Sequence, residues 1–247
     1  MIRFAQKCYT TILSVFFPLR CQISGDYLPA YPIRHLNTKY YDQLFNSIDA
    51  VCTVCGKPAP PHSDTPHLCG DCRHKSEPSI RFISAGHYSG ILKKLIHLMK
   101  YKHKAFLSDT LGEFLLKFLQ FQQIDLSRYN WIIPIPLSPV KIRERGFNQS
   151  ERISETVSKS FNIPINSCTL FRKNHPFSQT SLNRIERLLN LKDVFYTARN
   201  HKLKGKKIIL VDDVRSTGST LYYASECLFH CGVKNILTLT LANNDIL

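Results

Sequence analysis

One segment near the C-terminus constrains the fold of this chain more than any other. The apolar run 207–211 leads directly into two carboxylates, Asp212 and Asp213. A small polar loop over 215–220 follows, and an apolar helical pattern begins at 221. In an open α/β sheet, ligands bind beyond the carboxyl ends of the strands, where such acids and loops lie. The segment therefore predicts a parallel sheet and the position of its binding site.

The residue types of this segment suit a ligand that carries both hydroxyl and phosphate groups. Ionised Asp212 and Asp213 only accept hydrogen bonds, as sugar hydroxyls require. The loop opens a helix, whose backbone N–H groups and dipole favour an anion. Its residues are Arg215, Ser216, Thr217, Gly218, Ser219 and Thr220. A phosphorylated ribose fits this combination.

The same residues could also belong to another kind of domain or to a turn without a ligand. A phosphoacceptor signalling domain needs about 100 further residues, and only 34 follow Asp213. The spacing matches neither a P-loop nor a dinucleotide fingerprint. Turn and capping residues with no ligand remain the alternative. The ligand hypothesis requires both aspartates to face a crevice, and it is wrong if they are buried in salt links.

Apolar patterns of strand and helix length alternate along the rest of the chain. Strands are predicted at 82–87, 131–135, 168–171, 194–196, 207–211 and 236–241, and helices at 91–99, 108–119, 148–161 and 220–229. Alternating apolar strands and helices indicate a mainly parallel α/β sheet. Ser108 or Asp109 is the predicted N-cap of one helix, and Asn148 of another. No internal repeat is apparent.

Four of the nine cysteines have a metal-binding spacing. Cys52 and Cys55 form one C-x-x-C pair, and Cys69 and Cys72 form a second pair after 13 intervening residues. Two such pairs can place four thiolates around one tetrahedral Zn²⁺. A zinc ribbon is therefore predicted over 51–75, with a structural role. Reduced thiols also indicate a cytoplasmic location.

Three further cysteines, Cys168, Cys227 and Cys231, fall in apolar segments and are expected to be buried. The apolar run 12–19 is shorter than the roughly 20 residues that span a bilayer. No small-residue cleavage site follows it. It predicts a short amphipathic helix and no membrane span.

The formal charge of +15 is unevenly distributed. Residues 1–80 hold 8 Lys and Arg against 6 Asp and Glu, whereas residues 81–247 hold 25 against 12. Such a field favours anionic ligands and nucleic acid. A solvated surface without a partner is the alternative.

The segment at 211–220 is similar to the signature of the phosphoribosyltransferases, and the chain more narrowly resembles the ComF family. The resemblance extends from about Cys52 to the C-terminus. The segments that carry it are 131–136 (WIIPIP), 143–150 (RERGFNQS), 171–173 (FRK), 179–182 (QTSL), 187–190 (RLLN) and the cysteine-rich region. The chain departs from the family at Arg215 and Ser216, where two threonines are usual. It also departs at Ser24, which follows Cys21 where relatives often have a second cysteine.

The resemblance implies a type I phosphoribosyltransferase-like α/β domain at 79–247, preceded by an N-terminal helix and zinc-ribbon region at 1–78. It implies that 5-phosphoribosyl-1-pyrophosphate binds with Mg²⁺, with Asp212 and Asp213 in the catalytic position and the 215–220 loop on the 5′-phosphate. The pyrophosphate would lie against the loop and helix that follow the strand at 131–135. The expected pyrophosphate-binding residues are Leu137, Ser138, Arg143 and Arg145.

Two of these assignments have open alternatives. Guanidinium groups suit phosphate oxygens, but Arg143 and Arg145 can instead pair with acids such as Glu144. The polar residues 172–187 suit a lid that closes over the ligand, or an ordinary solvated loop.

Two functions follow from the resemblance. The first is an Mg²⁺-dependent phosphoribosyltransferase, for which the sequence indicates no acceptor. The second is a non-catalytic module that senses the sugar phosphate and takes part in uptake of transforming DNA, with single-stranded DNA and a competence helicase as partners.

Overall fold

The protein was analysed as a computed structural model, which describes residues 19–28, 35–74, 78–102, 104–173, 194–197 and 203–244. The predicted helix at 12–19 and most of the predicted lid at 172–187 lie outside these residues. Cys8 lies outside them as well.

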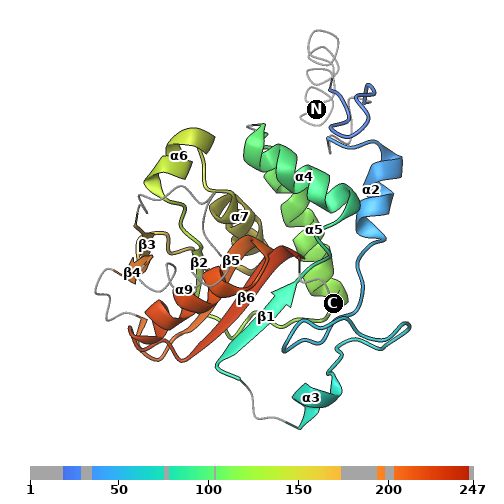
Figure 1. Cartoon of the computed structure of the whole chain (residues 1–247). Helices are drawn as coiled ribbons and strands as arrows, with labels where there is room; N and C mark the ends of the chain where they lie inside the picture. Colours follow the sequence, from blue (N-terminus) through green and yellow to red (C-terminus); the bar gives the residue numbers. More distant parts are fainter. Residues whose placement is uncertain are drawn as a thin grey trace, which may run out of the picture.

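A four-stranded parallel sheet lies at the centre of the fold (Figure 1). Its strands are β1 (Ile80–Ser84), β2 (Trp131–Pro134), β5 (Lys207–Arg215) and β6 (Asn235–Asn243). Their order across the sheet is β1-β6-β5-β2, and every pairing is parallel. The predicted parallel α/β architecture is therefore confirmed, although β1 begins two residues before the predicted strand at 82–87.

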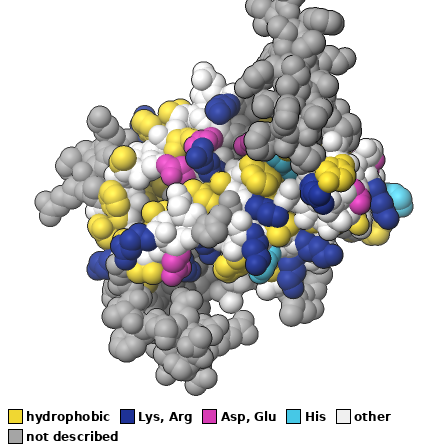
Figure 2. All heavy atoms as spheres, turned by 90° about the horizontal axis from the view of Figure 1, so that it is seen from above, with side chains coloured by type: hydrophobic (Ala, Val, Ile, Leu, Met, Phe, Trp, Pro, Cys, Tyr) yellow, Lys and Arg dark blue, Asp and Glu magenta, His cyan; other side chains and the backbone are white. Residues whose placement is uncertain are grey.

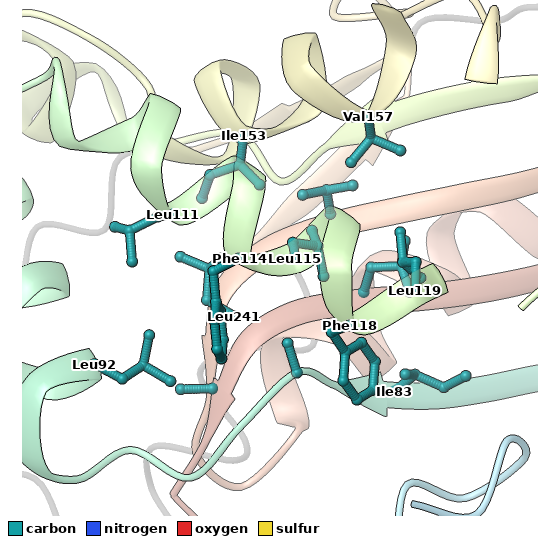
Figure 3. Packing of buried hydrophobic residues seen from close by; sticks show 14 of the residues in the cluster. Ile83, Leu92, Leu111, Phe114, Leu115, Phe118, Leu119, Ile153, Val157 and Leu241 are labelled. Carbon is teal, nitrogen blue, oxygen red and sulfur yellow. The ribbon is translucent and has the colours of Figure 1, made fainter. Parts of the chain in front are cut away.

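Helices on both faces of the sheet bury its apolar side chains. The helices on one face are α4 (Gly90–Tyr101), α5 (Leu107–Phe121) and α7 (Gln149–Phe161). Large side chains from α5, including Phe114 and Phe118, fill the space between this layer and the sheet (Figure 3).

The opposite face is covered by α9 (Ser219–Phe229). One apolar core lies on each face of the sheet, and alternate residues of β5 contribute to each. Ile209 and Val211 pack towards α5, while Ile208 and Leu210 pack towards α9. Side chains of a strand alternate between faces. A strand that is apolar at both sets of positions must therefore lie at the centre of a covered sheet.

The start of α5 differs from the predicted helix. The N-cap residue is Phe106, which makes no side-chain capping bond. Ser108 is 2% exposed, and its hydroxyl donates to the carbonyl of Ala105 (2.6 Å) instead. The prediction of Ser108 or Asp109 as N-cap is wrong because the helix already begins at Leu107, whose side chain is fully buried.

A short helix that the apolar pattern does not indicate, α6 (Pro139–Arg145), follows β2. The hydroxyl of Ser138 accepts from the backbone N–H of Lys141 (3.4 Å), and Pro139 occupies the first turn, where it is tolerated. Gly146 ends the helix with a positive φ of 76°. The next helix, α7, begins after Asn148, whose side chain accepts from Ser150 N–H, as predicted for its cap.

Two short antiparallel strands, β3 (Leu170–Arg172) and β4 (Phe195–Thr197), form a separate sheet. Cys168 precedes β3 and is exposed, so its predicted burial is wrong, while Cys227 and Cys231 are partly buried. The residues of this segment that are buried are its neighbours Thr169 and Leu170.

The N-terminal region contains α2 (Thr38–Phe45) and α3 (Gly70–Arg73) and lies along the open edge of β1. The N–H of Phe82 donates to Val54 O (3.1 Å), and the Arg81 guanidinium donates to Thr53 O. A Cβ on Gly56 would lie 2.5 Å from Phe82 O, so only glycine fits this approach. The region thereby covers an edge that would otherwise present unpaired backbone groups.

No helix within the described ranges has the length and apolar character needed to cross a bilayer.

Candidate functional site

Asp212 and Asp213 lie near the carboxyl end of the central strand β5, as predicted, and the strand continues through Arg215. Their neighbours come from α4, α7 and the loop before α9. The two carboxylates have different surroundings.

The Asp213 side chain is 5% exposed, and its Oδ1 lies 2.7 Å from Lys100 Nζ. Its Oδ2 is buried and has no hydrogen-bond partner. Burial opposes the charge on Lys100, but the adjacent carboxylate outweighs this effect and raises the pKa of the ammonium group. Asp213 is therefore buried in a salt link and fails the condition set for both aspartates, so the ligand hypothesis depends on Asp212.

Asp212 is partly exposed and accepts two hydrogen bonds at Oδ1. One comes from the Ser150 hydroxyl (3.0 Å) and the other from the Asp213 backbone N–H (2.9 Å). Burial, and then the negative charge of Asp213, raise the Asp212 pKa to about 7. One of the two adjacent acids is thus held close to the point at which it exchanges a proton near neutral pH.

Cations from three different elements surround the pair. Lys100 comes from α4, Lys141 and Arg145 come from α6, and Arg172 comes from β3. Burial, then Arg172 and Arg145, lower the pKa of Lys141, and burial lowers that of Arg172. Lys100, Lys141 and Arg172 therefore lie close enough to interact electrostatically with the two acids, and Arg145 interacts in the same way with Lys100 and Lys141. Such a site favours an anion with several charges.

Sequence reasoning did not identify Lys100 or Lys141 as site residues. Lys100 ends an apolar helical pattern, and nothing local distinguishes it from Lys93 or Lys94. Only the packing of α4 across the end of β5 brings its ammonium group to Asp213. Lys141 lies two residues before the predicted Arg143, so the spacing in α6 was a usable signal.

The predicted phosphate loop has the geometry of an anion site. Gly218 adopts a positive φ of 75° and precedes α9, whose first turn has no side-chain cap. Ser216 and Thr217 are exposed, and the Thr217 and Ser219 hydroxyls lie 2.7 Å apart. The Arg215 guanidinium lies 5.8 Å from the centroid of the Phe82 ring, so this unusual residue extends towards β1.

The predicted pyrophosphate residues divide into two groups. Leu137 and Ser138 precede α6 and are partly buried, with Ser138 serving as its cap. Arg145 is partly buried, lies near Lys100 and Lys141, and is 5.5 Å from the Tyr101 ring centroid. Arg143 is exposed, and no contact brings it to the pair.

A second feature is the cluster of Cys52, Cys55, Cys69 and Cys72, whose sulfur atoms all lie within 4.8 Å of one another. Cys55 Sγ and Cys69 Sγ are 3.7 Å apart, close to the roughly 3.8 Å edge of a tetrahedron with Zn–S bonds of 2.3 Å. Burial opposes the Cys52 thiolate, but backbone N–H groups outweigh it and lower its pKa to about 6. The donor set and its dimensions therefore fit a metal ion.

A cavity of about 400 Å³ lies between the N-terminal region and the sheet. Its wall includes Asp49, His62, His87, Phe121 and Asn243. Neither aspartate nor the phosphate loop contributes to it. Asn243 pairs with Arg215 across β5 and β6, which is the nearest link between the cavity and the loop.

Comparisons with known proteins agree with this geometry. Residues 135–246, which include both the aspartates and α6, match the model of the phosphoribosyl transferase domain. The chain is 33% identical over 180 residues to competence protein F of Haemophilus influenzae, covering 70% of this chain and 77% of that protein. It is 29% identical over 189 residues to competence protein ComFC of Bacillus subtilis, covering 74% and 72%.

The DNA utilization protein YhgH of Escherichia coli K12 is 30% identical over 188 residues, which cover 75% of this chain and 81% of that protein. Among solved structures, a purine phosphoribosyltransferase from Pyrococcus horikoshii aligns with 57% of this chain and 78% of its own, at 20% identity and a TM-score of 0.34. An allosteric regulatory enzyme of purine biosynthesis aligns over only 25% of its own length, at 17% identity and a TM-score of 0.36. The family assignment therefore rests on the sequence matches.

Proposed function

The chain belongs to the ComF family, and from this premise we propose that it binds 5-phosphoribosyl-1-pyrophosphate together with Mg²⁺ at the Asp212 site. The observation that supports this proposal is the pair of acids with Lys100, Lys141 and Arg172 near it, at the strand end that leads to the N-terminus of α9. Hydroxyl, phosphate and pyrophosphate groups each find a complementary partner within this cluster.

The roles follow from the position of each residue. Asp212 accepts from the ribose hydroxyls, and Asp213 does so once its ion pair opens. The loop over 216–220 binds the 5′-phosphate through backbone N–H and hydroxyl groups. Lys141 and Arg145 bind the pyrophosphate. Arg143 is the least supported of the predicted contacts, because it is exposed.

The carboxylate oxygens fit Mg²⁺, which prefers oxygen ligands and usually keeps several waters. The buried Asp213 Oδ2 has no donor, as expected of an acceptor that waits for a cation or a hydroxyl group. When bound, Mg²⁺ would neutralise oxygens of the pyrophosphate leaving group.

The reaction that suits this site is phosphoribosyl transfer. The bond between the anomeric carbon and the pyrophosphate oxygen breaks, pyrophosphate takes the electron pair, and a nucleophile forms a new bond to that carbon. Cations around the leaving group stabilise its developing charge. No described residue is assigned as the base for an acceptor, so the acceptor stays open.

Calorimetric titration of 5-phosphoribosyl-1-pyrophosphate with Mg²⁺ tests the site. We expect saturable binding to the wild type and a loss of at least about tenfold in affinity in Asp212→Asn, because the amide carries no charge. The matched control is Asp125→Asn, which changes an exposed loop acid and should bind as the wild type does. Unchanged binding in an Asp212→Asn, Asp213→Asn double variant would show that the site is assigned incorrectly.

The relatives named for competence and DNA utilization support a second candidate, a non-catalytic module in DNA uptake. In this case the sugar phosphate regulates binding to single-stranded DNA or to a competence helicase. Release of pyrophosphate separates the two candidates. Turnover with any acceptor in a screen of nucleophiles supports the enzyme, whereas ligand binding without release favours the module.

We also propose that the four-cysteine cluster holds a structural Zn²⁺ and that the chain divides into an N-terminal helix and zinc-ribbon region at 1–78 and a phosphoribosyltransferase-like domain at 79–247. Closed tetrahedral sites with four cysteine ligands are typically structural. All eight described cysteines are free thiols, which supports a cytoplasmic location.

A further inference from the structure

Asp213 presents no oxygen that a ligand can reach. Its Oδ1 is paired with Lys100, and its Oδ2 is buried without a partner. The Lys100 side chain itself is only 15% exposed. A ligand can therefore use the second aspartate only if the ammonium group moves first.

Lys100 is suited to such a movement. It lies at the end of α4, on a long side chain that carries a single charge without a fixed hydrogen-bonding geometry. Burial opposes its charge, so the Asp213 carboxylate is what holds the ammonium in place. Arg145 and Lys141 lie close enough to affect it electrostatically, which places Lys100 on the same side as the cations assigned to the pyrophosphate.

From these contacts we propose that Lys100 is a positioning residue that exchanges partners when the site fills. In the empty protein its ammonium group neutralises Asp213. When Asp213 is taken up by a cation or by ribose hydroxyls, the ammonium group turns to the pyrophosphate oxygens. This inference rests on the proposed ligand and adds a residue to its site.

The exchange predicts opposite effects on two ligands. In Lys100→Gln, Mg²⁺ alone should bind several-fold more tightly, because its internal competitor for Asp213 is gone. Binding of 5-phosphoribosyl-1-pyrophosphate with Mg²⁺ should weaken by about tenfold to a hundredfold, because a charge-assisted hydrogen bond is lost. Lys94→Gln on the exposed side of the same helix is the matched control and should change neither affinity.

Other outcomes are informative in different ways. Parallel loss of both affinities, or no change in either, would overturn the exchange and leave Lys100 a structural residue. If the wild type binds no 5-phosphoribosyl-1-pyrophosphate, the proposed function fails, which is a separate result. Should Lys100→Gln not fold, acetylation of wild-type Lys100 followed by mass spectrometry gives the answer. We expect its reactivity to rise with Mg²⁺ alone and to fall when the sugar phosphate is added, and a constant reactivity contradicts the proposal.

A second, independent inference concerns the segment before the cysteine cluster. Two turns of the N-terminal region, at 21–26 and at 52–57, have the same backbone hydrogen bonds. In the cluster, Cys52 N–H donates to Lys57 O (2.8 Å), and Gly56 N–H donates to Cys52 O (2.9 Å). Thirty-one positions earlier, Cys21 N–H donates to Asp26 O (2.7 Å), and Gly25 N–H donates to Cys21 O (2.9 Å). Both glycines have positive φ, 74° and 82°.

The second halves of the two units also correspond. Thr53 N–H donates to His67 O (3.0 Å), and Gln22 N–H donates to His35 O (2.9 Å). Each histidine is followed by a leucine and then by the N-cap of a helix. The two N-caps, Cys69 and Asn37, have nearly the same backbone angles: φ −68° and ψ 160° against φ −70° and ψ 163°.

This correspondence assigns each metal-ligand position a counterpart. The four cysteines of the cluster, in order Cys52, Cys55, Cys69 and Cys72, correspond to Cys21, Ser24, Asn37 and Tyr40.

Polar contacts occupy the place of a metal in the first unit. The Asn37 amide donates to Asp26 Oδ2 (3.3 Å) and to Ser24 Oγ (3.4 Å), and Ser24 Oγ donates to Asp26 Oδ2 (2.6 Å). The Asn37 N–H also donates to Cys21 Sγ (3.4 Å). We infer that residues 20–28 and 35–45 belong to a second copy of the ribbon unit, which hydrogen bonds hold together in place of a metal ion.

Metal content tests this inference. Wild-type protein should contain one Zn²⁺ per chain. The variant Ser24→Cys, Asn37→Cys, Tyr40→Cys restores four thiols and should bind a second ion, seen as a doubled thiolate-to-cobalt absorption when Co²⁺ replaces Zn²⁺. A folded variant that still holds one ion overturns the inference. Two ions in the wild type also overturn it, and that measurement does not depend on whether the variant folds.

Discussion

Two adjacent carboxylates inside a protein are costly to ionise together, because each disfavours the charge of the other. Here Lys100 stabilises the charge of Asp213, while Asp212 has only neutral hydrogen-bond donors and a pKa raised to about 7. Asp213 is therefore paired with a cation, whereas the charge of Asp212 depends on pH near neutrality. The two aspartates are therefore expected to respond differently when a ligand binds: Asp213 must leave its ion pair, and Asp212 must lose its proton.

We expect the affinity for Mg²⁺ to rise as pH increases through about 7, the Asp212 pKa. Below this value the carboxyl group is protonated and offers no charge to a cation, and above it the gain levels off. Calorimetry in buffers of different ionisation enthalpy should detect up to one proton released per ion bound near neutral pH. Asp212→Asn should bind weakly at every pH, and a pH dependence that survives in this variant must come from another group.

Local sequence signals located the N-cap of α7 correctly but not that of α5, which begins at the buried Leu107. Asn148 caps α7, and Gly146 ends α6 with a positive φ. Both preferences depend on residues nearby in the chain. The ion pair of Lys100 depends on residues 113 positions apart in the chain, so no local pattern could indicate it.

At the level of helices and strands, the contact between α5 and α7 is unusually close. A Cβ on Gly112 would lie 2.5 Å from Thr156 Oγ1 and 2.8 Å from Thr156 Cβ. The glycine therefore allows α7 to approach α5 while its N-terminal Ser150 reaches Asp212. The helix contact and the site are connected through α7.

We predict that Gly112→Ala destabilises the protein by about 1–3 kcal/mol. Alanine favours a helix by about 1 kcal/mol over glycine, but here the added carbon overlaps atoms that a short side chain cannot move away. Urea unfolding measures the difference. Ser160→Ala on the exposed side of α7 is the control, and it should change stability by less than about 0.5 kcal/mol. A neutral or stabilising Gly112→Ala would mean that the two helices can separate at little cost.

The N-terminal ribbon should depend on its metal and in turn protect β1. Chelation, or Cys55→Ser, removes the constraint that holds Val54 beside Phe82. We expect amide hydrogen exchange at Phe82 to become several-fold faster, because its backbone hydrogen bond is lost. Cys168→Ser changes an exposed cysteine outside the cluster and should have no effect. Equal protection with and without metal would show that the ribbon keeps its fold by packing alone.

For the molecule as a whole, the positive charge extends beyond the site. Figure 2 shows more Lys and Arg than Asp and Glu side chains on the face that it presents. Most of the formal charge of +15 belongs to residues 81–247. Such a surface favours nucleic acid through release of counterions, independently of sequence.

If the protein binds single-stranded DNA directly, the affinity should fall by about tenfold or more between 50 and 200 mM salt. Fluorescence anisotropy with a labelled oligonucleotide measures this dependence. Asp212→Asn should retain binding, because the surface charge and not the aspartate pair provides the attraction. An absence of binding at low salt would exclude direct contact with DNA and leave a protein partner as the remaining route.

The sequence by itself determined the parallel sheet, the end of β5 as the place of the acids, the loop before α9 and the grouping of four cysteines. Each of these depends on neighbouring residues or on a fixed spacing, which short-range sterics and metal geometry translate directly into structure. The tertiary structure alone decided that Asp213 pairs with Lys100, which other cations lie near the pair, and that Arg143 is exposed while the Lys100 side chain is largely buried. Only the paired backbone hydrogen bonds point to the proposed second ribbon unit, because three of its four metal-ligand positions carry other residues. Burial and charge at such positions are set by segments distant in the chain, and these meet only when α4, α6, α7 and β3 are assembled around β5.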